Sequence, residues 1–178
     1  MDTAHRRAVR RGPVLWLVLH STEGYEGPGR AIACARWLAK PKKRGRRSSA
    51  HYILDGRDIV HLVHDDAEAW HAGTTANKHG IGIELCGSAR QTREQWLDAQ
   101  SAPMLIHAAM LIRALADRHA IPLNVACAQD LKQFRRGVTT HADVTMAFGE
   151  TTHWDPGPSF PMMDLIIAAR RAPPQLIS

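Results

Sequence analysis

A short apolar run that ends in a histidine constrains the fold of this chain more than any other feature. Residues 14–19, Val-Leu-Trp-Leu-Val-Leu, are followed at once by His20, Ser21 and Thr22. A short continuous apolar run bounded by polar residues is typical of a buried strand. Such a strand carries the imidazole of His20 to the rim of a sheet, where sites are commonly built.

A second stretch, residues 139–160, holds the other candidate site residues. It contains His141, His153 and Asp155, and a Pro-Gly-Pro turn follows Asp155 directly. A polar cluster that leads into such a turn favours neither helix nor strand, so we expect a loop that carries a site. His20, His141 and Asp155 together offer two nitrogens and one oxygen. This is the ligand set of a catalytic zinc site that keeps its fourth position open for water.

Strands and helices are predicted to alternate along the rest of the chain. Further strands are expected at 49–54, 58–63 and 80–85, and an Asp-Gly turn joins the first two as a hairpin. Helices are expected at 30–39, 92–119, 128–134 and 163–170, with Pro103 bending or splitting the longest of them. Residues 65–78 are expected to be mostly irregular. This order predicts an α/β fold: a single domain with a central mixed β-sheet, helices packed on it, and the zinc site at the strand ends.

Length and charge limit the possible partners. The 178 residues fit one domain, and 44% of them are hydrophobic, which is enough for a proper core. The net charge of +6 and the pI of about 9.7 favour an anionic partner: nucleic acid, membrane or the bacterial wall. The basic run at 40–47 is either a solvated loop or a contact for wall polymers. It has no interleaved aromatic residues, which argues against nucleic acid.

The cysteines and the N-terminus bear on the compartment. Three cysteines without a C-x-x-C pair do not indicate a disulfide framework. The polar, basic N-terminus carries no cleavage signature, so we expect no signal peptide. No apolar stretch is long enough for a membrane span, and no stable membrane insertion is expected. We therefore expect a protein made in the cytoplasm that reaches any wall target by another export route.

Six short motifs between residues 14 and 165 carry a family resemblance. In chain order they are V-L-H-S-T, S-A-H-Y-I-L-D-G-R-D-I-V, A-W-H-A-G, G-I-G-I-E-L, T-H-A-D-V-T and H-W-D-P-G-P-S-F. The chain resembles the zinc-dependent N-acetylmuramoyl-L-alanine amidases, which are related to phage lysozyme-type amidases and peptidoglycan recognition proteins. Its compact build is most similar to a phage endolysin or its amidase domain. The resemblance covers roughly residues 14–165, and we expect a flexible lead-in at 1–13, an amidase catalytic domain at 14–172 and a tail at 173–178.

The resemblance implies a zinc hydrolase that cuts the amide bond between N-acetylmuramic acid and L-alanine in peptidoglycan, with His20, His141 and Asp155 as ligands. Glu84 is the candidate general base and acid, because a carboxylate within an apolar strand is costly unless it has a partner or a task. Some family members use a tyrosine on the preceding strand, where this chain has Ala50. Relatives often carry a lysine at the position of His153, where it helps to stabilise the oxyanion.

Weaker expectations concern the substrate groove. Trp70 and His71 resemble a groove wall, Thr22 is expected to orient the surroundings of His20, and His51 is a candidate supporting residue; any of these side chains is otherwise a packing residue. The thiolate of Cys86 is an alternative metal ligand, but the resemblance assigns that position to Asp155.

Three other functions remain open at this point. They are a non-catalytic peptidoglycan-binding module of the same fold, a zinc amidase or peptidase for another amide, and, on charge alone, a nucleic-acid binder. Our leading hypothesis is a monomeric zinc amidase that acts on peptidoglycan after release to the wall, with no nucleic-acid partner.

Overall fold

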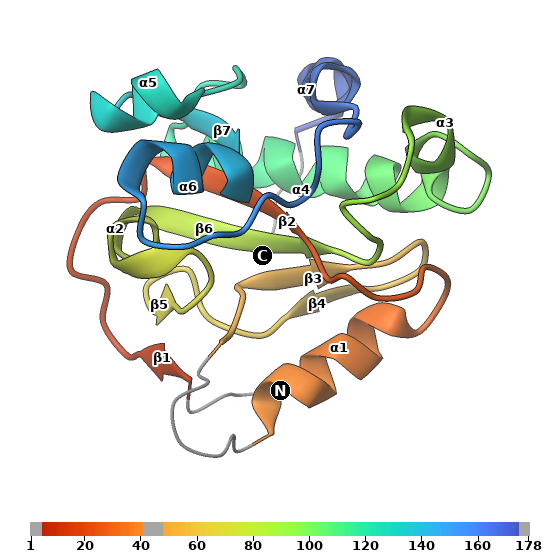
Figure 1. Ribbon diagram of the computed structural model, residues 1–178, viewed down its shortest axis with the longest axis horizontal. Helices are drawn as coiled ribbons and strands as arrows, with labels where there is room; N and C mark the ends of the chain where they lie inside the picture. The colour runs from red at the N-terminus through yellow and green to blue at the C-terminus, as the bar shows by residue number, and fades with distance from the viewer. Residues whose placement is uncertain (1–4, 41–47, 175–178) are drawn as a thin grey trace.

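A five-stranded mixed sheet forms the centre of the domain (Figure 1). The computed structural model describes residues 5–40 and 48–174. The strands lie in the order β4 (Ile59–His61), β3 (Tyr52–Leu54), β6 (Gly80–Leu85), β2 (Trp16–Ser21) and β7 (Gly137–Thr140). The last four run parallel, and β4 is antiparallel at the edge. The predicted α/β domain with a mixed sheet is therefore confirmed.

The Asp-Gly turn predicted between β3 and β4 is present and is held by one buried carboxylate. Asp55 accepts hydrogen bonds of 2.7 Å from the backbone N–H groups of both Arg57 and Asp58. It also accepts the N–H of Ala31, at 2.9 Å, in the first turn of α1 (Arg30–Ala39). The same side chain thus closes the hairpin and ties it to the first helix.

Helices cover both faces of the sheet. The remaining ones are α2 (Gly73–His79), α3 (Arg93–Trp96), α4 (Ala102–His119), α5 (Ala128–Lys132), α6 (His141–Phe148) and α7 (Met162–Arg171). Leu17 and Leu19 of β2 belong to the core that includes the apolar residues of α4 and α7. Trp16 and Val18 belong to the opposite cluster, with buried residues of α2, α5 and α6. Because strand side chains alternate, His20 lies on the second face, beside α2 and α6.

The long helix predicted at 92–119 is split in two, as the proline suggested. Thr92 caps α3 through a hydrogen bond from the backbone N–H of Gln95, and the Gln95 side chain reaches back to complete a capping box. Pro103 lies in the first turn of α4, where a missing N–H costs nothing.

Two sequence-based predictions are wrong. Residues 139–160 are not a continuous loop, because they contain the end of β7 and the whole of α6. The Thr140 side chain accepts the N–H of Asp143 and caps the helix, and Gly149 ends it at a φ of 64°. Residues 65–78 are not mostly irregular either, since they contain β5 (Glu68–Ala69) and most of α2.

The N-terminal segment is built into the domain rather than lying apart from it. Arg6–Arg7 form strand β1, which pairs antiparallel with β5. The Arg10 guanidinium donates to backbone carbonyls of five residues, Asp65, Ala67, Asn77, Lys78 and Gly80. For residues 5–13 this differs from the flexible lead-in expected at 1–13, and residues 1–4 lie outside the described part of the chain. Most of the basic run at 40–47 and most of the tail at 173–178 lie outside the described residues. Among those described, none of the helices combines the length and hydropathy that a transmembrane span requires.

Candidate metal centre

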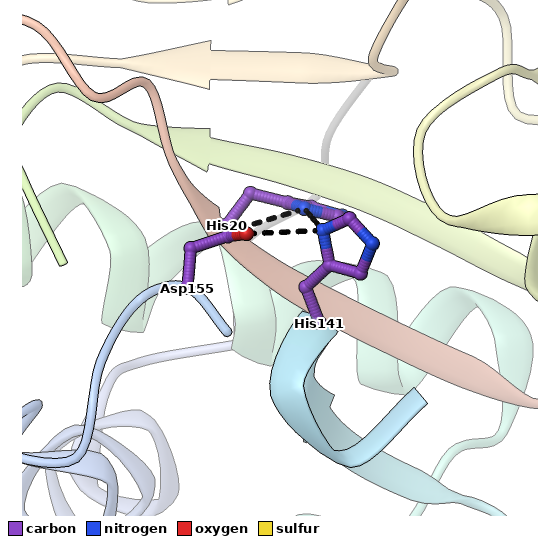
Figure 2. Close-up of side chains that lie close together, drawn as sticks. All are labelled: His20, His141 and Asp155. Carbon is purple, nitrogen blue, oxygen red and sulfur yellow. Dashed lines mark hydrogen bonds and ion pairs between the residues drawn. The ribbon is translucent and has the colours of Figure 1, made fainter. Parts of the chain in front are cut away.

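Three side chains from three separate segments converge at the end of β2 (Figure 2). His20 Nδ1 lies 3.0 Å from His141 Nδ1 and 3.1 Å from Asp155 Oδ2. His141 Nδ1 lies 3.1 Å from the other carboxylate oxygen, Oδ1. His20 comes from β2, His141 is the first residue of α6, and Asp155 follows that helix in a loop. All three are buried, and two imidazole nitrogens and a carboxylate face one another.

The remaining ring nitrogens of both histidines are occupied away from this cluster. His20 Nε2 lies 2.9 Å from His71 Nδ1, and His141 Nε2 lies 3.1 Å from the Thr151 hydroxyl. Thr151 Oγ1 is in turn 2.6 Å from Thr145 Oγ1. Metal-binding histidines usually donate their second N–H to such a partner, which fixes the ring and leaves the other nitrogen bare. The donor set and its surroundings therefore fit a zinc ion.

The charges also suit a cation. Burial alone would raise the pKa of Asp155, but the close contacts with His141 and His20 outweigh it and hold that pKa well below its usual range. Burial lowers the pKa of His20, with the Asp155 hydrogen bond acting in the opposite direction. An ionised carboxylate and a neutral imidazole are the forms in which these groups bind metal.

The cluster opens onto a cavity of about 900 Å³ that also holds Glu84. Glu84 is the register partner of His20 on the neighbouring parallel strand, so the two side chains lie on the same face. Burial, followed by the negative charges of Asp155 and Glu23, raises the pKa of Glu84 to about 8. A carboxyl group with a pKa near neutrality is suited to take up and release a proton. The structure thus brings the predicted acid–base residue to the predicted ligands.

His153 lies at the outer side of the cluster. Its ring stacks on that of His141 with centroids 4.7 Å apart and an interplanar angle of 6°. Its Nδ1 is 3.6 Å from Asp155 Oδ1, and 66% of its side chain is exposed. The residue lines the cavity beside the three predicted ligands.

The remaining predicted residues fall into two groups. Trp70, His71 and Thr22 line the cavity. His51 is fully buried and does not line the cavity. Its Nδ1 accepts the backbone N–H of Gly82 at 2.9 Å. Cys86, the alternative ligand, is also buried away from the cavity, and burial raises the pKa of its thiol to about 12. Because Cys86 does not line the cavity with the three clustered side chains, its position does not support it as a ligand.

The sequence analysis did not single out several residues that line the cavity, and three of them bear on the site. Thr151 partners His141, Glu23 adds negative charge beside Glu84, and Trp37 of α1 lines the cavity. Glu23 is fixed by hydrogen bonds from the Ser21 hydroxyl at 2.6 Å and the Ala89 N–H at 2.8 Å. None of them belongs to a residue pattern, and only the closeness of Glu23 to His20 in the sequence was a usable signal.

Several solved structures are similar to this chain, among them a hydrolase and an amidase. The Staphylococcus aureus hydrolase AmiA, solved with its ligand, is 18% identical with a TM-score of 0.69, covering 98% of this chain and 86% of that one. The catalytic domain of XlyA is 23% identical, with a TM-score of 0.64 and coverage of 93% and 92%. The N-acetylmuramyl-L-alanine amidase AmiD from E. coli is 22% identical, with a TM-score of 0.60 and coverage of 91% and 60%. These similarities show a shared fold, and no curated protein matches significantly.

The sequence itself settles the family. Residues 10–158 match the Amidase_2 family model, described as N-acetylmuramoyl-L-alanine amidase. The chain belongs to this family of peptidoglycan amidases. The resemblance inferred from the six motifs is therefore confirmed.

Proposed function

We propose that this protein hydrolyses the amide bond between N-acetylmuramic acid and L-alanine by means of a zinc ion held by His20, His141 and Asp155. The observation that carries the proposal is the convergence of two Nδ1 atoms and a carboxylate within 3.1 Å of one another, beside Glu84 in one cavity. Family membership supports the amide bond as the target.

The chain's own residues supply the proton transfers. When bound, zinc provides Lewis acidity toward the scissile carbonyl and lowers the pKa of a water molecule to about 7. Glu84 takes a proton from the attacking water and returns it to the leaving nitrogen of L-alanine. Its pKa of about 8 applies without metal, and a nearby cation lowers it toward the range of a general base at neutral pH.

The cavity walls orient the substrate. His153, exposed beside His141, donates an N–H to the developing oxyanion in the role that a lysine plays in relatives. Trp70 and Thr22 line the cavity, and we propose that they contact the muramoyl peptide. His51 has no access to the cavity and supports His71, whose ring it meets edge-on at a centroid distance of 5.8 Å.

The proposed substrate is the glycan-linked stem peptide of peptidoglycan. The AmiD structure contains anhydro-N-acetylmuramic acid-L-Ala-D-gamma-Glu-L-Lys as substrate, which supports a muramyl peptide as ligand of this fold. We further propose that the protein acts as a monomer on the bacterial wall, in the manner of a phage endolysin, without a nucleic-acid partner.

Product analysis of digested wall tests this proposal. Purified peptidoglycan is incubated with the zinc-loaded protein, and new amino termini and new reducing sugar ends are both quantified. We expect new N-terminal L-alanine with no increase in reducing ends, and no release by Glu84→Gln at equal zinc content. New reducing ends, amino termini of other residues, or binding to wall without release would each contradict the proposed reaction.

A further inference from the structure

The contact between His20 and His71 determines where the protons of both rings must lie. His20 Nε2 and His71 Nδ1 are 2.9 Å apart, which is a hydrogen-bond distance. Two imidazole nitrogens at this distance share one proton, so one ring donates and the other accepts. The choice of donor fixes the tautomer of both residues.

Only one of the two arrangements permits His20 to bind a metal. His20 presents Nδ1 to His141 and Asp155, so this nitrogen must be bare to act as a ligand. A neutral imidazole with bare Nδ1 carries its proton on Nε2. His20 Nε2–H then donates, and His71 Nδ1 accepts.

The surroundings hold the His71 ring in place for this contact. The side-chain oxygen of Asn77 accepts the backbone N–H groups of His71 and Ala72, at 2.8 and 2.9 Å. The ring packs on Gly82, where an added Cβ would lie only 2.6 Å from the His71 Cγ. His71 Nε2 is buried without a hydrogen-bond partner among the described residues. Within that part of the chain, the bond to His20 is the one polar interaction that fixes the ring's tautomer.

We propose that His71 is a positioning residue that holds His20 in the tautomer with the proton on Nε2 and the Nδ1 lone pair directed at zinc. This inference rests on the proposed zinc site, and it gives His71 a role other than substrate contact. Carboxylates and carbonyls commonly orient metal-bound histidines, and here a second, neutral histidine does so.

Two variants separate hydrogen bonding from packing. His71→Phe keeps a flat ring against Gly82 but has no acceptor, whereas His71→Asn loses the ring and keeps an acceptor near the Nδ1 position. His64→Ala is the matched control, since it removes an exposed histidine outside the cavity. The equilibrium zinc affinity of each protein is measured by competition with a chromogenic chelator.

We expect the zinc Kd to rise about 10–100-fold in His71→Phe, the usual effect of losing such a partner. His71→Asn should recover most of the affinity, and the control should match the parent. Retained affinity in His71→Phe with loss in His71→Asn would overturn the proposal in favour of packing. Unchanged affinity in both, with a raised KM, would overturn it in favour of substrate contact.

Nitrogen-15 NMR of the parent protein gives a second readout that does not depend on any variant folding. Long-range proton–nitrogen spectra of the zinc-loaded protein should show the proton of His71 on Nε2. A proton on Nδ1 would overturn the role of His71 while leaving the zinc site intact. A parent protein that binds no zinc would overturn the site itself, and the inference with it.

Discussion

Replacing Glu84 by glutamine should change how the stability of the metal-free protein depends on pH. The pKa of Glu84 is raised from 4.5 to about 8, so the folded state holds this proton more tightly than the unfolded chain. As pH rises above 4.5, the unfolded chain loses the proton first, and the free energy of unfolding falls until about pH 8. At about 1.4 kcal/mol per pH unit, the full difference corresponds to roughly 5 kcal/mol. Because Glu84 is only partly buried and faces an open cavity, solvent screening reduces this to about 2–3 kcal/mol.

Urea unfolding at pH 5 and pH 8, with a chelator present, measures this effect. Glutamine cannot ionise, so the free energy of unfolding of Glu84→Gln lacks this fall. Its difference from the parent should therefore shift by about 2 kcal/mol in favour of the variant from pH 5 to pH 8. His20 and His51 are buried and have lowered pKa values, so they also make stability depend on pH. Their contribution is the same in both proteins and cancels in the comparison. A constant difference between parent and variant would show that Glu84 ionises normally, and would refute the reasoning behind its catalytic role.

Other substitutions test the remaining parts of the site. The three proposed ligands are His20, His141 and Asp155. Alanine at any one of them should abolish stoichiometric zinc binding and wall hydrolysis. Full zinc occupancy in one of these variants would show that the replaced residue is not a ligand. Gly82→Ala forces a Cβ against the His71 ring. We therefore expect the free energy of unfolding to fall by about 1–3 kcal/mol and zinc to bind more weakly. Unchanged stability and zinc affinity would mean that the ring moves freely. His153→Ala should lower kcat roughly 10²-fold while zinc stays bound, as expected for the loss of one oxyanion donor. His153→Lys should keep kcat close to that of the parent. Equal turnover in all three proteins would make His153 a bystander.

The parts of the site that the sequence predicts are those with a local pattern. The apolar run before His20 and the alternation around Glu84 predict two strands, and parallel pairing in register then places both side chains on one face. The Asp-Gly turn predicts the hairpin, and Pro103 predicts the break in the long helix. In each case the determinant lies within a few residues of the element.

The errors have a different origin. Residues 139–160 were predicted as a loop because polar residues dominate, but the helix within them is specified by Thr140 at its start and Gly149 at its end. Thr151 and Trp37 reach the cavity only through tertiary packing, which no local pattern records. The pairing of His71 with His20 also depends on the sheet register and on the bare backbone of Gly82.

X-ray absorption at the zinc edge of the loaded protein tests the central claim most directly, namely that three residues from distant segments form one zinc site. We predict two imidazole nitrogens at about 2.0–2.1 Å and a carboxylate oxygen at about 2.0–2.2 Å, and no such zinc signal from Asp155→Ala, which should not bind the metal stoichiometrically. A sulfur neighbour at about 2.3 Å, or a spectrum that Asp155→Ala leaves unchanged, would contradict this claim.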